Sequence, residues 1–227
     1  MTRRPSRWRR ALRWTLLGWL ALCGVGALWP APPPRPEAPA RVLCASLPSP
    51  LGAVAVHCWF VLEGHERWDV WQEADVGPVA YDHVHRDLQP PEAGVGGGAT
   101  FEWAALDGSA GTAFAACLRV EAPRYADRAT YRAWPGPNSN TFVDAMLRQC
   151  GWSLRLPGTA VGKDWRGLVG ASTWGLGVQV ESPLFGAAVG LDRGFELRVL
   201  ELTLGVELWP PAIVHPFGGG RLGFPRR

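Results

Sequence analysis

The sequence predicts an α+β fold in which an antiparallel sheet packs against a helix. Residues 51–72 contain a β-branched and aromatic run, a short turn and a second such run, which is typical of a hairpin. Residues 138–150 place apolar side chains at helical spacing, and residues 172–208 return to strand-like patterns. With 227 residues and 47% apolar composition, the chain is long enough to bury one core.

The N-terminus predicts a membrane anchor over residues 1–30. Six arginines and no acidic residue precede Trp14, and the uncharged run WTLLGWLALCGVGALW extends from Trp14 to Trp29. As a helix this run is roughly 24 Å long, close to the ~30 Å of a hydrocarbon core. The arginines favour the cytoplasmic side, which predicts a single-pass protein of the cell inner membrane with its C-terminal domain outside the cytoplasm. A cleaved secretory signal is the alternative, because its basic front and apolar middle look the same.

The rest of the chain divides into a linker and a globular domain. Residues 31–48 are rich in proline and predict an extended spacer, and residues 49–227 predict the extracytoplasmic domain. Without the six N-terminal arginines, the 23 basic residues become 17 against 20 acidic ones. This balance argues against nucleic acid and leaves the cytoplasmic membrane, through Trp14–Trp29, and a cell-wall or lipid ligand as expected partners.

Four cysteines follow the linker. In an oxidising compartment they could form two disulfides, but four cysteines allow three connectivities and buried free thiols are the alternative. They are Cys44, Cys58, Cys117 and Cys150.

The hairpin at residues 51–72 brings a histidine onto a strand. If Glu63 pairs with Glu66 around a Gly-His turn, then His57 lies opposite Gln72. A register shift of one residue would place Trp71 or Glu73 there instead.

Two further elements follow from spacing and parity. Residues 109–120 predict a helix that begins at a serine cap. In FELRVLELTLGVEL the parity of the apolar positions changes near Val199, which predicts a bulge or bend.

A helix that begins at Asn138 or Ser139 and ends at Cys150 is the best-defined element. Its apolar face comprises residues 142, 143, 146, 147 and 150, and Gly151 ends it. With Asn138 as the cap, Ser139 is the first helical residue and its side chain points toward the body of the protein. Ser139 could simply cap the helix, because Asn, Ser and Thr all do so. A helix N-terminus also favours developing negative charge, as a nucleophile or oxyanion requires.

The segments YRAWPGPNSNTFV and LPGTAVGKDW, with the glycine-rich C-terminal strands, resemble the domain of unknown function 3750 family. This bacterial family has no established activity, and the resemblance covers roughly residues 50–225.

A second resemblance is to circularly permuted papain-like proteins, in which a strand carrying His precedes an Asn-Cys that opens a helix. Here VHCWF supplies His57, and Asn138 with Ser139 opens the helix. The resemblance implies Ser139 as nucleophile, His57 as base and Gln72 or Glu73 as the residue that orients the base. Ser139 Oγ should then lie within about 5 Å of a His57 ring nitrogen. Ser139 stands where Cys is expected, and a serine hydroxyl depends wholly on its base. The candidate binding residues around it are Trp134, Asn138 and Asn140.

Other candidate sites are weaker, and we expect neither cofactor nor metal. His83 and His85 would share one face of a strand, but no third ligand is evident. The GVGGG stretch runs into a strand and lacks the Gly-Lys-Ser/Thr of a nucleotide loop.

Two functions fit this sequence. The favoured one is a non-catalytic envelope domain that binds a ligand or partner, because no nucleophile is activated on its own account. The alternative is a serine variant of a papain-like hydrolase or acyltransferase that acts on amide or ester bonds in the cell envelope.

Overall fold

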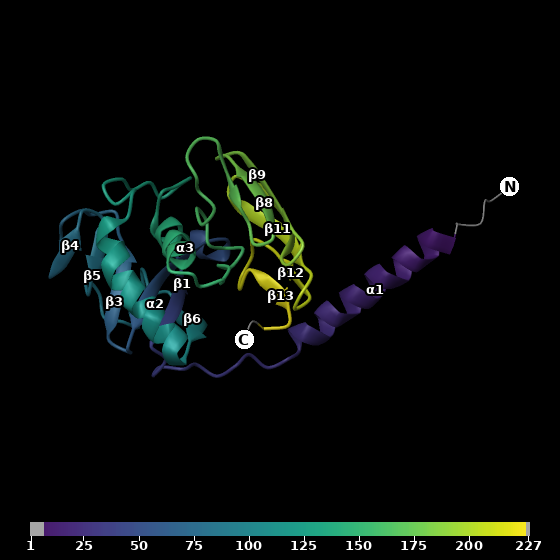
Figure 1. The fold of residues 1–227 in the computed structure, drawn as a ribbon, viewed down its shortest axis with the longest axis horizontal. Coiled ribbons are helices and arrows are strands. Elements are labelled where there is room, and N and C mark those ends of the chain that lie inside the picture. The colour runs from purple at the N-terminus through teal and green to yellow at the C-terminus, as the bar shows by residue number, and fades with distance from the viewer. Residues whose placement is uncertain (1–6, 226–227) are drawn as a thin grey trace.

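The computed structural model describes residues 7–225, in which two antiparallel sheets are joined by helices and loops (Figure 1). Sheet A has six strands in the order β4-β5-β3-β2-β1-β6, and sheet B has seven strands in the order β13-β12-β11-β10-β9-β8-β7. The strands of sheet A are β1 (Ala40–Ser46), β2 (Val56–Leu62), β3 (Glu66–Val70), β4 (Val79–Tyr81), β5 (Val84–Arg86) and β6 (Thr100–Leu106). The predicted α+β class, with an antiparallel sheet packed against a helix, is confirmed.

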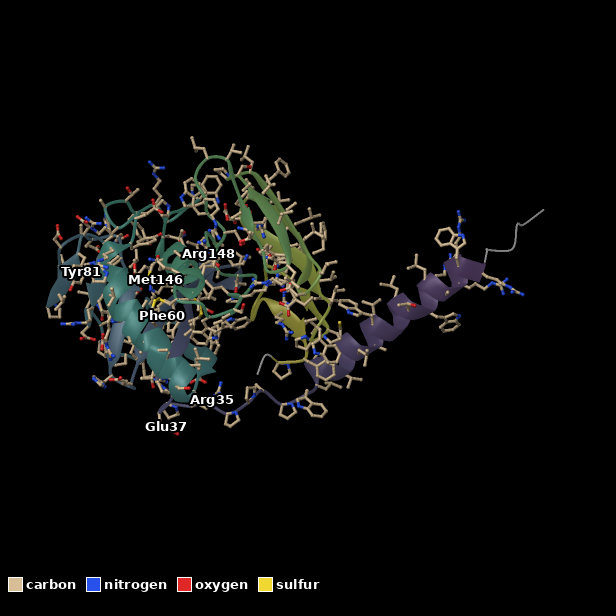
Figure 2. The ribbon with its side chains drawn as sticks, viewed as in Figure 1. Arg35, Glu37, Phe60, Tyr81, Met146 and Arg148 are labelled. Carbon is tan, nitrogen blue, oxygen red and sulfur yellow. A yellow bond between two sulfur atoms is a disulfide. The ribbon has the colours of Figure 1, made fainter. Side chains whose placement is uncertain are left out.

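Two helices, α2 (Gly108–Glu121) and α3 (Ser139–Gln149), cover one face of sheet A. The core between them contains Phe60 of β2 and Met146 of α3, which lie close together in Figure 2. Short 3-10 helices occur at Leu51–Ala53 and Ala122–Arg124. The helix predicted from a serine cap at residue 109 begins one residue earlier, after Asp107, whose side chain makes no capping hydrogen bond.

The first hairpin differs from its predicted register by one residue. Leu62, not Glu63, pairs with Glu66, so the connecting loop has three residues. Glu63 and Gly64 both adopt positive φ in this three-residue loop. The shift brings the rings of His57 and Trp71 to a centroid separation of 5.2 Å. It also changes the residues available to hold His57.

The N-terminal helix α1 (Arg7–Ala27) projects from the domain (Figure 1). Among residues 7–225, no helix is both long enough and apolar enough to cross a membrane. In α1, arginines occupy the first two turns, so the apolar part of the helix is short. The membrane anchor that the sequence predicts over residues 1–30 stays a prediction. Arg3 and Arg4, which contributed to that prediction, lie outside the described residues.

The proline-rich segment is not a free spacer. The sequence predicts that the linker extends to residue 48, but Ala40–Ser46 forms β1, which lies between β2 and β6 in sheet A. Upstream, the Arg35 amide donates to Glu102, and the Arg35 guanidinium donates to Asp107 at 2.5 Å and to the Ala105 carbonyl at 2.8 Å. The folded domain therefore begins before residue 49, because this segment is fixed along β6.

Two disulfides select one of the three possible connectivities. Cys44 and Cys58 are directly opposite across β1 and β2 and are joined, and Cys117 of α2 is joined to Cys150 at the end of α3. The second bond ties both helices of the core layer together.

Sheet B is a meander in which each strand pairs with the next. Its strands are β7 (Gly170–Thr173), β8 (Gly177–Glu181), β9 (Phe185–Gly190), β10 (Gly194–Val199), β11 (Leu202–Glu207), β12 (Ala212–Val214) and β13 (Arg221–Gly223). The parity change near Val199 marks a complete reversal. Val199 pairs with Leu202, and Leu200 and Glu201 form a two-residue turn with positive φ at both positions.

Candidate functional site

The first turn of α3 is capped by Asn138. Its side chain accepts from the amides of Asn140 at 3.0 Å and Thr141 at 3.2 Å, and the Thr141 hydroxyl accepts from the Asn138 amide at 3.1 Å. This reciprocal arrangement satisfies two free amides of the first turn, those of Asn140 and Thr141. Ser139 is therefore not the cap.

Asn140 joins α3 to the strand that carries His57. Its Oδ1 accepts from the Cys58 amide at 3.1 Å, and its Nδ2 donates to the Val56 carbonyl at 2.8 Å and the Val161 carbonyl at 2.9 Å. β3 pairs with only residues 60–62 of β2. Asn140 therefore bonds a part of β2 that does not pair with β3. The start of α3 is thereby fixed against the backbone on both sides of His57.

The same turn holds the loop that follows α3. Asn138 Nδ2 donates to the Val161 carbonyl at 3.2 Å, and the Thr141 hydroxyl donates to the Gly162 carbonyl at 2.6 Å. Gly162 adopts a φ of +83°, and a Cβ there would collide with the Asn138 amide. Only glycine fits this close approach. The PGPNSNTF and LPGTAVGKDW segments are therefore parts of one hydrogen-bonded unit.

Ser139 differs from its three polar neighbours. Its side chain is buried, with 3% of the residue exposed. Among the hydrogen bonds of residues 7–225, none involves the Ser139 hydroxyl or its backbone amide. Hydrogen bonds to the surrounding backbone occupy the side chains of Asn138, Asn140 and Thr141. The Ser139 hydroxyl makes no such bond.

His57 is held by a buried carboxylate. His57 Nε2 lies 2.8 Å from Asp69 Oδ1, and Asp69 Oδ2 accepts from Arg67 Nη2 at 2.6 Å and from Trp71 Nε1 at 3.0 Å. Burial alone would raise the pKa of Asp69, but the charges and hydrogen bonds of His57 and Arg67 hold that pKa below its ordinary value. Because Asp69 is ionised, His57 Nε2 carries the proton of this bond. Nδ1 is then the ring nitrogen that can accept a proton.

Asp69 replaces the residues that the sequence suggested for orienting His57. The Gln72 amide donates to the Glu73 carboxylate on the exposed surface at 2.8 Å, and neither side chain is bonded to His57. The prediction missed Asp69 because it considered only the residue directly opposite His57, whereas Asp69 lies two residues before Trp71 along the chain. A carboxylate between the apolar residues of RWDVW was the available signal.

The remaining candidate residues have structural contacts. Trp134 is half-exposed, and its indole donates to the Leu200 carbonyl at 3.3 Å. His83 Nδ1 lies 2.9 Å from the Trp71 carbonyl, and both nitrogens of His85 lie within 2.9 Å of backbone carbonyls. Within residues 7–225, no cluster of three or more His, Cys, Asp or Glu side chains could hold a metal ion.

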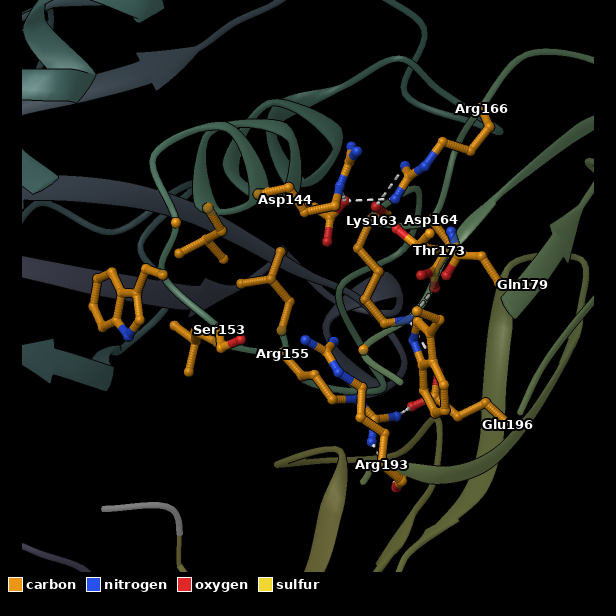
Figure 3. Close-up of a pocket in the computed structure, with 18 residues that line it drawn as sticks. Asp144, Ser153, Arg155, Lys163, Asp164, Arg166, Thr173, Gln179, Arg193 and Glu196 are labelled. Atoms are coloured by element: carbon orange, nitrogen blue, oxygen red, sulfur yellow. Dashed lines mark hydrogen bonds and ion pairs between the residues drawn. The ribbon is translucent and has the colours of Figure 1, made fainter. Parts of the chain in front are cut away.

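A polar pocket of about 350 Å³ lies between α3 and sheet B (Figure 3). Lys163 contacts Asp164, Arg155 contacts Glu196, and Arg166 bonds Asp144 of α3 at 2.7 Å. Burial lowers the pKa of Lys163, and Asp164 opposes that change. Lys163 takes part in ion pairs with Asp164 and Glu196. The lining of this pocket has five basic and three acidic side chains.

Comparison with known proteins adds a family. Residues 37–165 match the family model described as "Protein of unknown function (DUF3750)", which is more than half of the chain. The chain belongs to the DUF3750 family. No match was found among curated proteins or among solved structures.

The DUF3750 match includes sheet A, α2, α3 and the loop that Asn138 and Thr141 hold. It begins before the predicted residue 50 and ends before sheet B, which starts at Gly170. The DUF3750 region therefore contains Ser139, His57 and Asp69, whereas sheet B is a further part of this chain.

Proposed function

We propose that the DUF3750 region is a hydrolase or acyltransferase that acts on amide or ester bonds in the cell envelope. Ser139 is the nucleophile, His57 is the general base and Asp69 orients the base. One observation carries the proposal. His57 is bonded to a buried carboxylate, and Asn140, directly after the uncommitted Ser139, is bonded to the backbone on both sides of His57.

The proposed reaction uses each of these groups. His57 Nδ1 takes the proton as Ser139 Oγ attacks the substrate carbonyl, and Asp69 stabilises the imidazolium that forms. The amides of Asn140 and Thr141 are occupied by Asn138, so the Ser139 amide and the positive end of α3 are left to stabilise the oxyanion. His57 then protonates the leaving amine or alcohol, and water or an acceptor removes the acyl group. The order of strand base and helix nucleophile is the reason to keep a permuted papain-like arrangement in this proposal.

The second candidate is a non-catalytic domain that binds a ligand or partner. Two observations favour it. Ser139 and His57 are both nearly inaccessible, and neither residue lines the polar pocket of about 350 Å³. In that case the bond between His57 and Asp69 braces the fold.

A serine-reactive fluorophosphonate probe distinguishes the two candidates. We expect the probe to modify wild-type protein at Ser139, because an activated hydroxyl attacks phosphorus as it attacks a carbonyl. Ser139→Ala should lose the adduct, and His57→Gln should slow its formation by about 100-fold or more. Ser109→Ala, at the exposed start of α2, is the matched control and should label normally. Peptide mapping by mass spectrometry locates the adduct.

Failure of the probe has a clear meaning when it is combined with Ser139→Cys. If wild-type protein is not modified and Ser139→Cys also resists iodoacetamide, then position 139 is not a reactive centre. The non-catalytic function would then be the correct one.

We also propose that residues 41–227 work outside the cytoplasm, at the cytoplasmic membrane. The basic and then apolar N-terminus supports this location, and so do the two disulfides, which persist in oxidising compartments. A reporter that is active only in the cytoplasm, fused after Arg227, should be silent, whereas one that is active only outside should work. The opposite pattern would refute export.

A further inference from the structure

Sheet B has its polar face inside and its apolar face outside. Along β8, β9 and β10 each buried side chain alternates with an exposed one, and the buried set includes charged residues that reach toward the pocket. A globular sheet normally turns its apolar face toward the core. The buried polar side chains of sheet B are Gln179, Glu181, Glu196, Arg198, Thr203 and Glu207.

The outward face forms continuous apolar rows across the strands. One row crosses five strands through directly paired residues: Ala171, Val180, Ala187, Leu197 and Leu204. A second row crosses all seven: Thr173, Val178, Val189, Phe195, Val206, Ile213 and Leu222. Thr173 is the one polar side chain in these two rows, and neither row contains a charge. Such a face is larger than the isolated apolar residues of an ordinary surface.

The connections between the strands are apolar as well. Turns normally carry Gly, Pro, Asn, Asp and Ser, which solvate well. Here each connection from β7 to β13 exposes at least one large apolar side chain, and Leu200 does so in a turn with positive φ. These side chains are Leu176, Leu184, Leu191, Leu200, Leu208, Trp209 and Phe217.

Helix α1 continues this surface. The rings of Trp29 and Phe224 lie 6.1 Å apart, and an apolar hollow of about 640 Å³ lies between the end of α1 and the β11–β12 connection. Its lining includes Leu22, Trp29, Trp209 and Phe224. Figure 1 shows that α1 extends toward the side to which sheet B turns its outward face. The helix exposes tryptophans and leucines along its length and carries arginines at its far end.

We propose that the outward face of sheet B docks on the surface of a lipid bilayer that contains anionic lipids, beside α1. A second copy of the sheet could cover the flat rows, but it would leave the apolar turns at both ends of the strands in water. Lipid conforms to the rows and to the turns together. Tryptophan favours the boundary between water and hydrocarbon, and arginine favours anionic headgroups.

An environment-sensitive fluorophore tests this docking in the full chain. We would attach NBD to Leu197→Cys at the centre of the face and, as the matched control, to Val120→Cys on α2, which is also exposed. The probe is a vesicle of phosphatidylcholine and phosphatidylglycerol that contains doxyl-labelled lipid. We expect the fluorophore at position 197 to shift to the blue and to be quenched several-fold more than that at position 120.

Two outcomes would overturn the proposal. Equal quenching at positions 197 and 120 would show that α1 alone holds the protein on the vesicle. A blue shift at position 197 that depends on protein concentration and occurs without vesicles would show that a second copy covers the face. Vesicles of phosphatidylcholine alone should bind less protein, and equal binding to both kinds of vesicle would contradict the role of the anionic headgroups.

Discussion

Asn140→Ala is expected to lower the free energy of unfolding by about 3–5 kcal/mol, because it leaves two buried backbone groups, the Cys58 amide and the Val56 carbonyl, without partners. It also removes one of the two side-chain donors to the Val161 carbonyl, which keeps Asn138 Nδ2 as its other donor. The substitution therefore separates the helix from β2. Urea unfolding with the disulfides intact measures the loss.

Ser139→Ala is the matched control for Asn140→Ala. Both residues are buried in the first turn of the same helix, but Ser139 makes no hydrogen bond among those described and Asn138 still caps α3. We expect a loss of at most about 1 kcal/mol. Equal losses for the two variants would contradict the assignment of Asn140 as the bridge.

Asp69→Asn is expected to cost about 3–5 kcal/mol, because it leaves the buried Arg67 charge without its carboxylate. Arg67 is 1% exposed and makes two bonds to Asp69, so water cannot replace the carboxylate. The substitution also removes the charge that fixes the His57 ring, so labelling of Ser139 by the fluorophosphonate should fall with it. Thermal unfolding and labelling rate are the two measurements.

A double variant tests whether the cost of Asp69→Asn comes from the unpaired Arg67 charge. Arg67→Met together with Asp69→Asn should lose less stability than the sum of the two single variants, because no unpaired charge remains buried. Losses that simply add would show that the two side chains do not stabilise each other.

The pH dependence of Asp69 has a definite sign. Its pKa in the folded protein lies below the ordinary value of 3.8, so the stability that it contributes is present above that value. This stability is lost as the pH falls through the lower folded pKa. The wild-type protein should therefore lose stability more steeply than Asp69→Asn at acid pH.

Local sequence determined the elements around the candidate site. The helix from Asn138 was predictable because its cap, its apolar face and its terminal glycine all lie within the single segment 138–151. The hairpin that carries His57 was predictable because strand propensity and turn residues also act locally. The register of that hairpin was not predictable, since one additional loop residue shifts every pair by one, which turns Gln72 away from His57 and turns Asp69 and Trp71 toward it.

Sequence by itself determined the α+β class, the helix cap, the family resemblance and the presence of strands after residue 170. Only the tertiary structure decided which cysteines pair, that Ala40–Ser46 is a central strand and which face of sheet B is buried. Alternation with a period of two specifies a strand but not the direction in which its apolar side chains point. In sheet B that direction is set by charged residues from another part of the chain. Arg155 pairs with Glu196 and Glu207, Lys163 pairs with Glu196, and Asp164 pairs with Arg198. These ion pairs hold the polar face inward.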